Sequence, residues 1–237
     1  MSNAALRQIL ERQPVWRAAR LAAAPRALAT GFGRLDAELP GGGWPAGALT
    51  ELLVAHEGVG ELQLVLPALA ALSSSGKQVV CLAPPRLPYA PALLAAGVDL
   101  AQLLIVKPRE RREALWAAEQ ALRSSACAAL IAWLSATRYG ELQRLAVAAE
   151  TGGACALLFR APAAAGEPTP ACLRIRLEPA GGGLALHILK RRGAPAGAPL
   201  VLPLRTPFHA VGRPALHLAD RPGGTRDDCR LDVPVHA

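Results

Sequence analysis

The sequence has few aromatic residues and lacks any long apolar segment. Its 237 residues include four Trp, two Tyr and three Phe, so a folded core must be built from small aliphatic side chains. The longest stretches without a polar or charged side chain other than Tyr, Leu87–Val98 and Gly193–Leu204, contain both Pro and Gly and are twelve residues long. A bilayer-spanning helix needs about 18 apolar residues or more, so we expect no membrane span. The 52% hydrophobic content excludes a protein that is disordered throughout.

The N-terminal region also lacks a secretory signal. Arg7, Glu11 and Arg12 interrupt the stretch that a signal peptide keeps apolar, and Pro25-Arg26 interrupt the next one. We therefore expect a cytoplasmic protein.

The cysteines lack the spacing of a metal site or a redox pair. There are five: Cys81, Cys127, Cys155, Cys172 and Cys229. None forms a C-x-x-C pair, and four lie in or next to apolar, strand-like runs. We expect buried free thiols and no bound metal.

Lysine is scarce although the chain is basic. Only Lys77, Lys107 and Lys190 are lysines among 26 basic residues, and the formal net charge is +8 with a pI near 9.9. This balance permits an anionic partner such as nucleic acid but does not identify one.

Three regions follow from the turn and periodicity signals. The pattern predicts a short helix, Ala4–Arg12, and a linker in residues 1–29, and the folded core in residues 30–192. Residues 193–237 are a tail rich in Pro and Gly with one strand-like run, Leu200–Leu204.

In the core, apolar strands alternate with helices, which predicts an α/β fold with a mostly parallel sheet covered on both faces. The expected strands are Ala48–Val54, Gln78–Ala83, Leu103–Val106, Ala128–Leu134 and Ala154–Arg160, then an antiparallel hairpin of Ala171–Glu178 and Leu184–Arg192. The expected helices are Glu61–Ser75, Pro91–Ala96, Arg112–Ser124 and Tyr139–Thr151.

The loop between the first core strand and its helix has the position of a phosphate cradle but not its chemistry. A working P-loop reads G-x-x-x-x-G-K-[ST], in which the lysine neutralises phosphate charge and the hydroxyl holds magnesium. Here Ala55 replaces the first glycine, Gly58 and Gly60 lie in the loop, and Glu61 and Leu62 replace the lysine and the hydroxyl. A carboxylate about 4 Å from a phosphate charge is repelled by up to about 4 kcal/mol at an effective dielectric of about 20. The alternative role for Glu61 is structural, in the first turn of a helix whose dipole favours negative charge there.

Residues 30–160 resemble the core of RecA-type ATPases in their motifs and in the order of elements. The matching runs are Thr30-Gly31, Leu35-Asp36, Gly42-Gly43-Trp44-Pro45-Ala46-Gly47, Leu49-Thr50-Glu51-Leu52, Ala96-Gly97-Val98-Asp99-Leu100, Leu103-Leu104-Ile105-Val106-Lys107-Pro108, Glu113-Ala114-Leu115 and Ala121-Leu122-Arg123-Ser124. Further motifs are similar to the ImuA family of RecA-like accessory proteins: Val15-Trp16-Arg17, Leu39-Pro40-Gly41-Gly42-Gly43-Trp44-Pro45, Gly60-Glu61-Leu62, Leu66-Pro67-Ala68-Leu69-Ala70 and Pro88-Tyr89-Ala90-Pro91.

The resemblance implies a RecA-like, P-loop-type fold and a role in the SOS response to DNA damage. ImuA-type proteins act in mutagenic translesion DNA synthesis with ImuB, a polymerase-like protein without polymerase activity, and with an error-prone polymerase of the DnaE type. RecA and DNA are further candidate partners, and RecA-type domains also self-associate.

The residues that perform ATP hydrolysis in RecA-type enzymes are absent. Besides the lysine and the hydroxyl, the resemblance places Pro85 where those enzymes have a catalytic glutamate and Leu134 where they have a magnesium-organising aspartate. We expect a non-catalytic protein without a cofactor. Two alternatives remain: an active ATPase that uses displaced residues, and a cell-division inhibitor like SulA, whose family also resembles RecA without its nucleotide site.

Several residues outside the loop are candidates for binding or for packing. Trp16, beside Arg17 in the linker, either packs on the domain or anchors a partner. In the hairpin, Arg174 and Arg176 alternate along one strand and share a face. With residues at the end of the next strand they form either a DNA-binding cluster or a solvated sheet face; the cluster is Arg174, Arg176, Lys190, Arg191 and Arg192.

Other polar and aromatic residues have structural interpretations. Asp36 and Glu38 are expected in a turn or cap, and His56 in the loop has no nucleophile near it in sequence. Trp44 is expected to pack over the entry glycines, and Trp116 and Trp133 are expected in the core.

Overall fold

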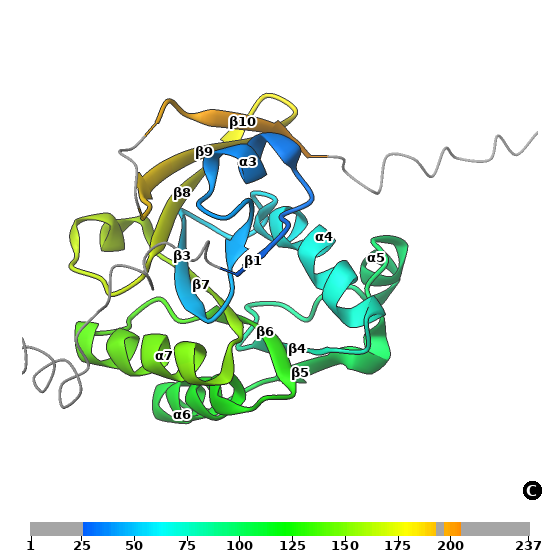
Figure 1. The fold of residues 1–237 in the computed structure, drawn as a ribbon, viewed down its shortest axis with the longest axis vertical. Helices are drawn as coiled ribbons and strands as arrows, with labels where there is room; N and C mark the ends of the chain where they lie inside the picture. Colours follow the sequence, from blue (N-terminus) through cyan, green and yellow to red (C-terminus); the bar gives the residue numbers. More distant parts are fainter. Residues whose placement is uncertain (1–25, 193–196, 205–237) are drawn as a thin grey trace, which may run out of the picture. The chain divides into compact units, whose positions relative to one another are not determined.

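The computed structural model describes residues 26–192 and 197–204 of the chain. The centre of the protein is an eight-stranded sheet in the order β10-β9-β8-β3-β7-β6-β4-β5 (Figure 1). Its strands are β3 (Ala48–Val54), β4 (Gln78–Leu82), β5 (Leu103–Val106), β6 (Cys127–Trp133), β7 (Cys155–Arg160), β8 (Leu173–Ala180), β9 (Gly183–Lys190) and β10 (Leu200–Pro203).

The sheet is mostly parallel. The six strands from β8 to β5 in the sheet order pair in parallel, whereas β8, β9 and β10 pair antiparallel. The parallel strands are apolar along most of their length because helices cover both faces; β7, for example, is buried at each of its six positions. The predicted α/β class, with a mostly parallel sheet and a C-terminal hairpin, is confirmed.

Helices form a layer on each face of the sheet (Figure 1). They are α3 (Gly33–Glu38), α4 (Glu61–Ser74), α5 (Ala90–Ala95), α6 (Arg111–Arg123) and α7 (Tyr139–Gly152), with short 3-10 turns at η1 (Leu100–Gln102) and η2 (Pro162–Gly166). Helices α3, α4 and α5 contribute to one apolar core, and α6 and α7 to the core on the opposite face.

The predicted elements agree with the structure to within two residues at each end, and the structure adds the helix α3 and the turns η1 and η2, which were not predicted. A short strand β1 (Ala27–Leu28) pairs antiparallel with β2 (Trp44–Pro45) and so ties the end of the expected linker to the core. Strand β10 extends the sheet beyond the expected core boundary at residue 192, because Leu200 and Leu202 bury their side chains in the α4-side core. The expected helix Ala4–Arg12 and most of the expected tail lie outside the described residues.

The tryptophans are less uniformly buried than predicted. Trp44 is fully buried. Trp133 is half-buried and stacks on Phe159 with ring centroids 4.8 Å apart. The prediction for Trp116 is wrong: its side chain is 63% exposed, because α6 turns Ala114, Leu115, Ala118 and Leu122 toward the sheet instead.

Among the described residues, none of the helices combines the length and the apolar character needed to cross a bilayer.

Candidate functional site

The loop of residues 55–60 joins the end of β3 to the start of α4. Parallel α/β sheets bind their ligands at this carboxyl end of the strands. Gly58 and Gly60 have φ of +82° and +101°, a left-handed conformation that favours glycine. The two glycines therefore make the turn of this loop.

The Glu61 side chain folds back onto this loop. Its Oε1 accepts a hydrogen bond from the N–H of Gly58 at 3.1 Å, and its Oε2 accepts one from the N–H of Gly60 at 3.1 Å. The residue is only 6% exposed. In a phosphate cradle such N–H groups bind the ligand anion. In this protein they bind a carboxylate of the chain itself, while Leu62, at the hydroxyl position, packs partly buried against the core.

The loop is also covered by the residue that follows β10. A methyl group built on Gly60 would lie 2.5 Å from Cδ1 of Leu204, which itself packs against the α4-side core. In the sequence Leu204 belongs to a strand-like run in the tail, and no local signal indicates that it meets the loop. The contact arises because β10 adds to the sheet edge and brings the end of this strand toward α4.

The two other positions that the resemblance aligns with catalytic residues of RecA-type enzymes also lie at this end of the sheet. After β4, Pro85 lines an open cavity of about 710 Å³ that also touches Gly58 and Trp133. After β6, Leu134 is 6% exposed and donates its backbone N–H to the carbonyl of Phe159. The side chains of Pro85 and Leu134 can neither accept a proton nor bind a metal. Neither position therefore supplies the carboxylate that RecA-type enzymes carry there.

Three of the titratable side chains that line this cavity are on the surface, whereas a fourth, Arg160, is buried. His56 and Glu57 are exposed loop residues, and Arg86 reaches Glu57 at 3.7 Å with a side chain that is 90% exposed. Among the described residues His56 contacts only the carbonyl of Glu57, at 3.4 Å. The arrangement offers an exposed, weakly paired set of charges and no oriented acid–base pair.

A buried ion cluster that was not predicted from the sequence lies below the loop. Glu51, on β3, is fully buried between Arg160 of β7 and Arg174 of β8. Its two oxygens accept hydrogen bonds from Arg160 Nη1 and Arg174 Nε, each at 2.7 Å. Arg160 also reaches Glu167 at 2.8 Å, and the carbonyls of Ala165 and Glu167 accept from Arg174 Nη1 at 3.0 and 2.9 Å. This cluster joins three adjacent strands to the η2 segment.

The prediction for Arg174, as part of a DNA-binding cluster or of a solvated sheet face, is wrong because the residue belongs to this buried ion cluster. The residue does share a face with Arg176, but it is 4% exposed and neutralised by Glu51, so it cannot contact DNA. The sequence signal was present: an isolated glutamate in an apolar strand must be paired if it is buried.

The other members of the predicted basic cluster do not form one free cationic surface. Arg176 pairs with Glu178 at 3.0 Å, and Arg191 pairs with Glu38 at 2.7 Å. Lys190 donates to the carbonyl of Thr169 at 2.9 Å, and Arg192 lies beside a separate cavity. Much of the predicted positive charge is thus neutralised within the protein.

Of the two acidic entry residues, Asp36 holds a turn as predicted, whereas Glu38 ends α3 and forms an ion pair that was not predicted. Asp36 Oδ1 accepts the backbone N–H of Thr30 at 2.8 Å and so holds the turn before α3. Glu38 binds Arg191, which ties α3 to the end of β9. Trp16 and Arg17, the candidate partner anchor, lie outside the described residues.

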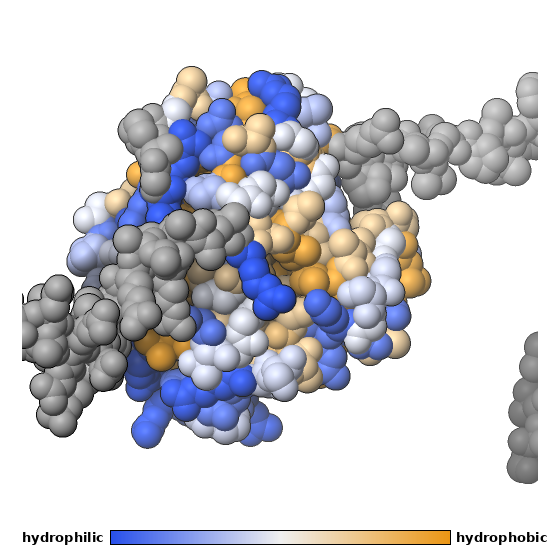
Figure 2. Space-filling view, viewed as in Figure 1, coloured by the Kyte–Doolittle hydropathy of each residue, from blue (hydrophilic) through white to orange (hydrophobic). Residues whose placement is uncertain are grey.

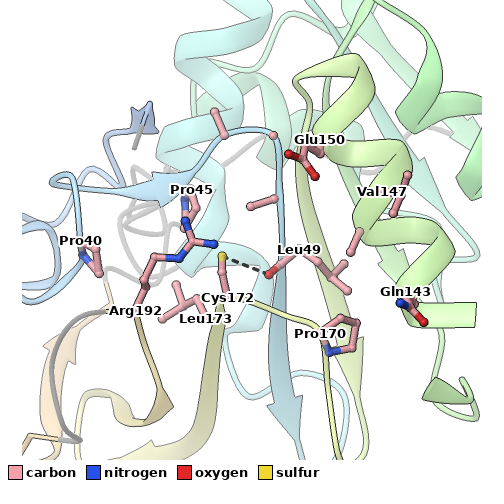
Figure 3. A pocket seen from close by; sticks show the side chains of 14 residues that line it. Pro40, Pro45, Leu49, Gln143, Val147, Glu150, Pro170, Cys172, Leu173 and Arg192 are labelled. Carbon is pink, nitrogen blue, oxygen red and sulfur yellow. Dashed lines mark hydrogen bonds between the residues drawn. The ribbon is translucent and has the colours of Figure 1, made fainter. Parts of the chain in front are cut away.

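A second cavity of about 330 Å³ lies at the opposite end of the parallel strands (Figure 3). It is bounded by the starts of β3 and β8 and by α7, and its walls include Pro45, Val147 and Cys172. The Cys172 thiol contacts the carbonyl of Leu49 at 3.4 Å, and the Arg192 side chain extends toward Cys172 (Figure 3). Burial raises the pKa of the Cys172 thiol although Arg192 acts to lower it.

The described cysteines are free thiols. Cys81, Cys127 and Cys155 are buried and Cys172 is half-buried. Burial raises the pKa of Cys81 and Cys155 to about 12 and that of Cys127 to about 11. The prediction of buried free thiols is confirmed for three of these four, and Cys229 lies outside the described residues.

Comparisons with known proteins give little direct guidance. No protein-family model matches the chain, and no curated protein is significantly similar to it. Among solved structures, the crystal structure of SulA from Pseudomonas aeruginosa is similar with 25% identity and a TM-score of 0.41. That match covers 47% of this chain and 97% of the SulA chain. A match with this TM-score does not indicate a function for this chain.

Proposed function

We propose that this chain is a RecA-like accessory protein without nucleotide hydrolysis, acting in damage-induced, error-prone translesion DNA synthesis. It serves as an adaptor that joins an ImuB-type protein and a DnaE-type polymerase. The ImuA-type motifs of the sequence suggest this role. The observation that carries its non-catalytic part is the hydrogen bonding of Glu61 to Gly58 and Gly60, which fills a phosphate cradle with the chain's own carboxylate.

Three further features support a non-catalytic role. Leu204 covers Gly60, Pro85 follows β4 and the buried Leu134 follows β6. A nucleotide at the loop would have to displace Glu61 and would gain neither a lysine nor a magnesium ligand in return. A displacement of this kind costs the hydrogen bonds that Glu61 makes and adds repulsion between carboxylate and phosphate.

The non-catalytic part of the proposal is tested by titrating Mg-ATP into the purified full-length chain in a calorimeter. We expect no binding heat at millimolar nucleotide, under conditions in which an active RecA-type ATPase binds. Tight Mg-ATP binding would favour the alternative of an ATPase with displaced residues.

The adaptor part is tested by affinity capture of the tagged chain from cells treated with a DNA-damaging agent, followed by mass spectrometry. We expect an ImuB-type protein or a DnaE-type polymerase among the captured proteins, and neither with an unrelated tagged control. Capture of the division protein FtsZ in their place would contradict the adaptor role and favour a SulA-like inhibitor.

A further inference from the structure

Trp116 is the most exposed of the large apolar residues that the structure describes. It is 63% exposed, although Leu115 beside it and Leu122 on the same helix are buried. Helix α6 thus turns its leucines toward the sheet and presents one tryptophan to solvent. An aromatic ring left in water forgoes the stabilisation that burial would give it. Such a ring is a candidate for a binding contact, since tryptophan is enriched among the residues that dominate binding.

An open cavity of about 430 Å³ lies beside Trp116, between α6 and α7. This volume is within the range of small-ligand sites. Apart from Trp116 and the buried Leu115, the residues that line it are charged: Arg111, Arg112, Glu119, Glu141 and Arg144. The cavity therefore combines one exposed aromatic ring with three guanidiniums and two carboxylates.

The carboxylates of this cavity are withdrawn from solvent, whereas the guanidiniums are not. The side chains of Glu119 and Glu141 are 16% and 21% exposed. Those of Arg111 and Arg144 are 46% and 61% exposed. Glu141 accepts a hydrogen bond from Arg111, and Glu119 lies 3.7 Å from Arg144. A ligand that approaches from solvent therefore meets positive charge first.

Arg112 adds a further positive charge next to the ring. It lies four residues before Trp116 on α6, a spacing that brings two side chains together on one face of a helix. The residue is exposed, and the part of the chain that the structure describes supplies no ion-pair partner for it. Its neighbour Glu113 is used within the chain to accept the backbone N–H of Arg109 at 2.7 Å. Arg112 can therefore bind an anion beside Trp116.

An exposed ring among guanidiniums matches the chemistry of single-stranded nucleic acid. The bases of a single strand stack on aromatic side chains, and arginines bind the phosphates between them. Hydrophilic residues gather over α6 at the bottom of the space-filling view (Figure 2). A protein partner would need an apolar interface core, but among the described residues that line this cavity Trp116 is the only exposed apolar one. The net charge of +8 also favours an anionic partner.

We propose that Trp116, Arg112 and Arg144 form a binding face for single-stranded nucleic acid. One base stacks on the indole ring, and the phosphates on either side of it contact the two guanidiniums. The face lies on α6 and α7 and includes neither the buried Arg174 nor any residue of the loop 55–60. Binding of this kind goes beyond the adaptor role proposed above and does not depend on it.

The binding face is tested by titrating a fluorescently labelled oligothymidylate with the full-length chain and measuring anisotropy. We expect Trp116→Ala to weaken binding about tenfold, and Trp116→Phe to retain most of the affinity, because a phenyl ring still stacks on a base. Arg112→Gln should weaken binding at low salt. It should also reduce the slope of log affinity against log salt concentration by about 0.7, the value for one phosphate contact on a single strand.

Two exposed residues outside this face provide matched controls. Tyr89 is 61% exposed and directly precedes α5, which packs on the opposite face of the sheet from α6. Arg86 has a side chain that is 90% exposed. Tyr89→Ala removes an aromatic ring and Arg86→Gln removes a guanidinium, and both variants should bind like the unchanged chain. Circular dichroism should show every variant folded, since each changed residue is exposed.

Cross-linking of an iodouridine-substituted strand, followed by peptide mapping, locates the contact. A cross-link to the α6 peptide that carries Trp116 supports the proposal. No binding of the strand by the unchanged chain, full affinity in Trp116→Ala, or cross-links confined to other segments would overturn it. A labelled polyglutamate that binds as tightly as the strand and loses affinity in Trp116→Ala would also overturn it, in favour of an acidic protein partner. None of these readouts uses an ImuB-type protein, so failure of the adaptor role and failure of the binding face are distinguishable.

Discussion

Glu61 accepts the backbone N–H of Gly58, three residues before it, at 3.1 Å, and its second oxygen accepts the N–H of Gly60 at the same distance. The residue that takes the place of the P-loop lysine thus also supplies an anion to the cradle. A single residue therefore departs from the P-loop pattern at the lysine position and also accepts hydrogen bonds from two N–H groups of the loop.

Removing the Glu61 carboxylate should destabilise the loop. Glu61→Ala leaves two N–H groups without their acceptor, and we expect a loss of about 1–2 kcal/mol in the free energy of unfolding. Sulfate or phosphate should restore part of this loss, because an anion that binds the folded state stabilises it. Urea denaturation with and without sodium sulfate measures the loss of stability and its partial restoration. The free energy of unfolding of Glu61→Ala is compared with that of the unchanged chain at the same salt concentration.

Glu57→Ala is the control for that substitution. It removes the same type of side chain four residues earlier, within the loop, but Glu57 is exposed and has only a 3.7 Å contact with Arg86. Its effect should stay below about 0.5 kcal/mol. Equal stability of the Glu61 and Glu57 variants would show that the cradle contributes nothing.

The buried ion cluster should be sensitive to the loss of its central charge. Glu51→Gln leaves the guanidiniums of Arg160 and Arg174 buried against a neutral amide, and removing one partner of a buried pair costs about 3–5 kcal/mol. The half-exposed pair of Arg176 and Glu178, 3.0 Å apart, provides the comparison, and Glu178 also contacts His187 Nε2 at 3.0 Å. Glu178→Gln should cost less than about 1 kcal/mol. Similar urea midpoints for the two variants would contradict a structural role for the Glu51 cluster.

Local sequence patterns predicted the fold well, because parallel strands buried on both faces are continuous apolar runs and amphipathic helices have a clear period. The strand Ala48–Val54 was predicted at both of its ends. Trp116 was misassigned because it directly follows the buried Leu115 in sequence, whereas the helix buries only a narrow stripe of Ala and Leu that does not include it. Sequence periodicity alone did not separate this stripe from the adjacent tryptophan.

The candidate site was predicted only in part. The sequence shows that Glu61 and Leu62 replace the lysine and the hydroxyl, since those are local substitutions in a spaced motif. It does not show that the Glu61 carboxylate turns inward or that Leu204 meets Gly60, because the latter contact joins residues from distant parts of the chain. Arg174 was assigned to the surface for the same reason: its partner Glu51 lies 123 residues earlier in the chain.

Thiol alkylation should separate the described cysteines. Burial raises the pKa of Cys81 and Cys155 to about 12. At pH 8 their thiolate fraction is therefore on the order of one in ten thousand, and only the thiolate reacts. Cys172 is half-buried and lines a cavity, so iodoacetamide should modify it first. Peptide mapping by mass spectrometry follows each site, and equal rates at Cys155 and Cys172 would contradict the buried arrangement.

The contact of Gly60 with Leu204 can be measured by comparing two glycines of the same loop. Gly58 and Gly60 both have positive φ, so alanine at either position costs about 1–2 kcal/mol in backbone strain. A methyl group on Gly58 meets nothing within 4 Å, whereas one on Gly60 lies 2.5 Å from Leu204 Cδ1. Gly60→Ala should therefore destabilise the protein more than Gly58→Ala by about 1 kcal/mol, the cost of a small steric overlap.

Truncation of Leu204 then separates the overlap from the backbone strain. In a Leu204→Ala background the excess cost of Gly60→Ala should disappear, while the cost of Gly58→Ala should not change, because Gly58 lies clear of that side chain. Urea denaturation of the single and double variants forms two double-mutant cycles that share the Leu204 substitution. A coupling energy near zero for Gly60 and Leu204 would mean that the residue after β10 does not cover the loop in solution. A coupling confined to Gly60 would establish that the end of β10 and the loop of residues 55–60 form one packed unit.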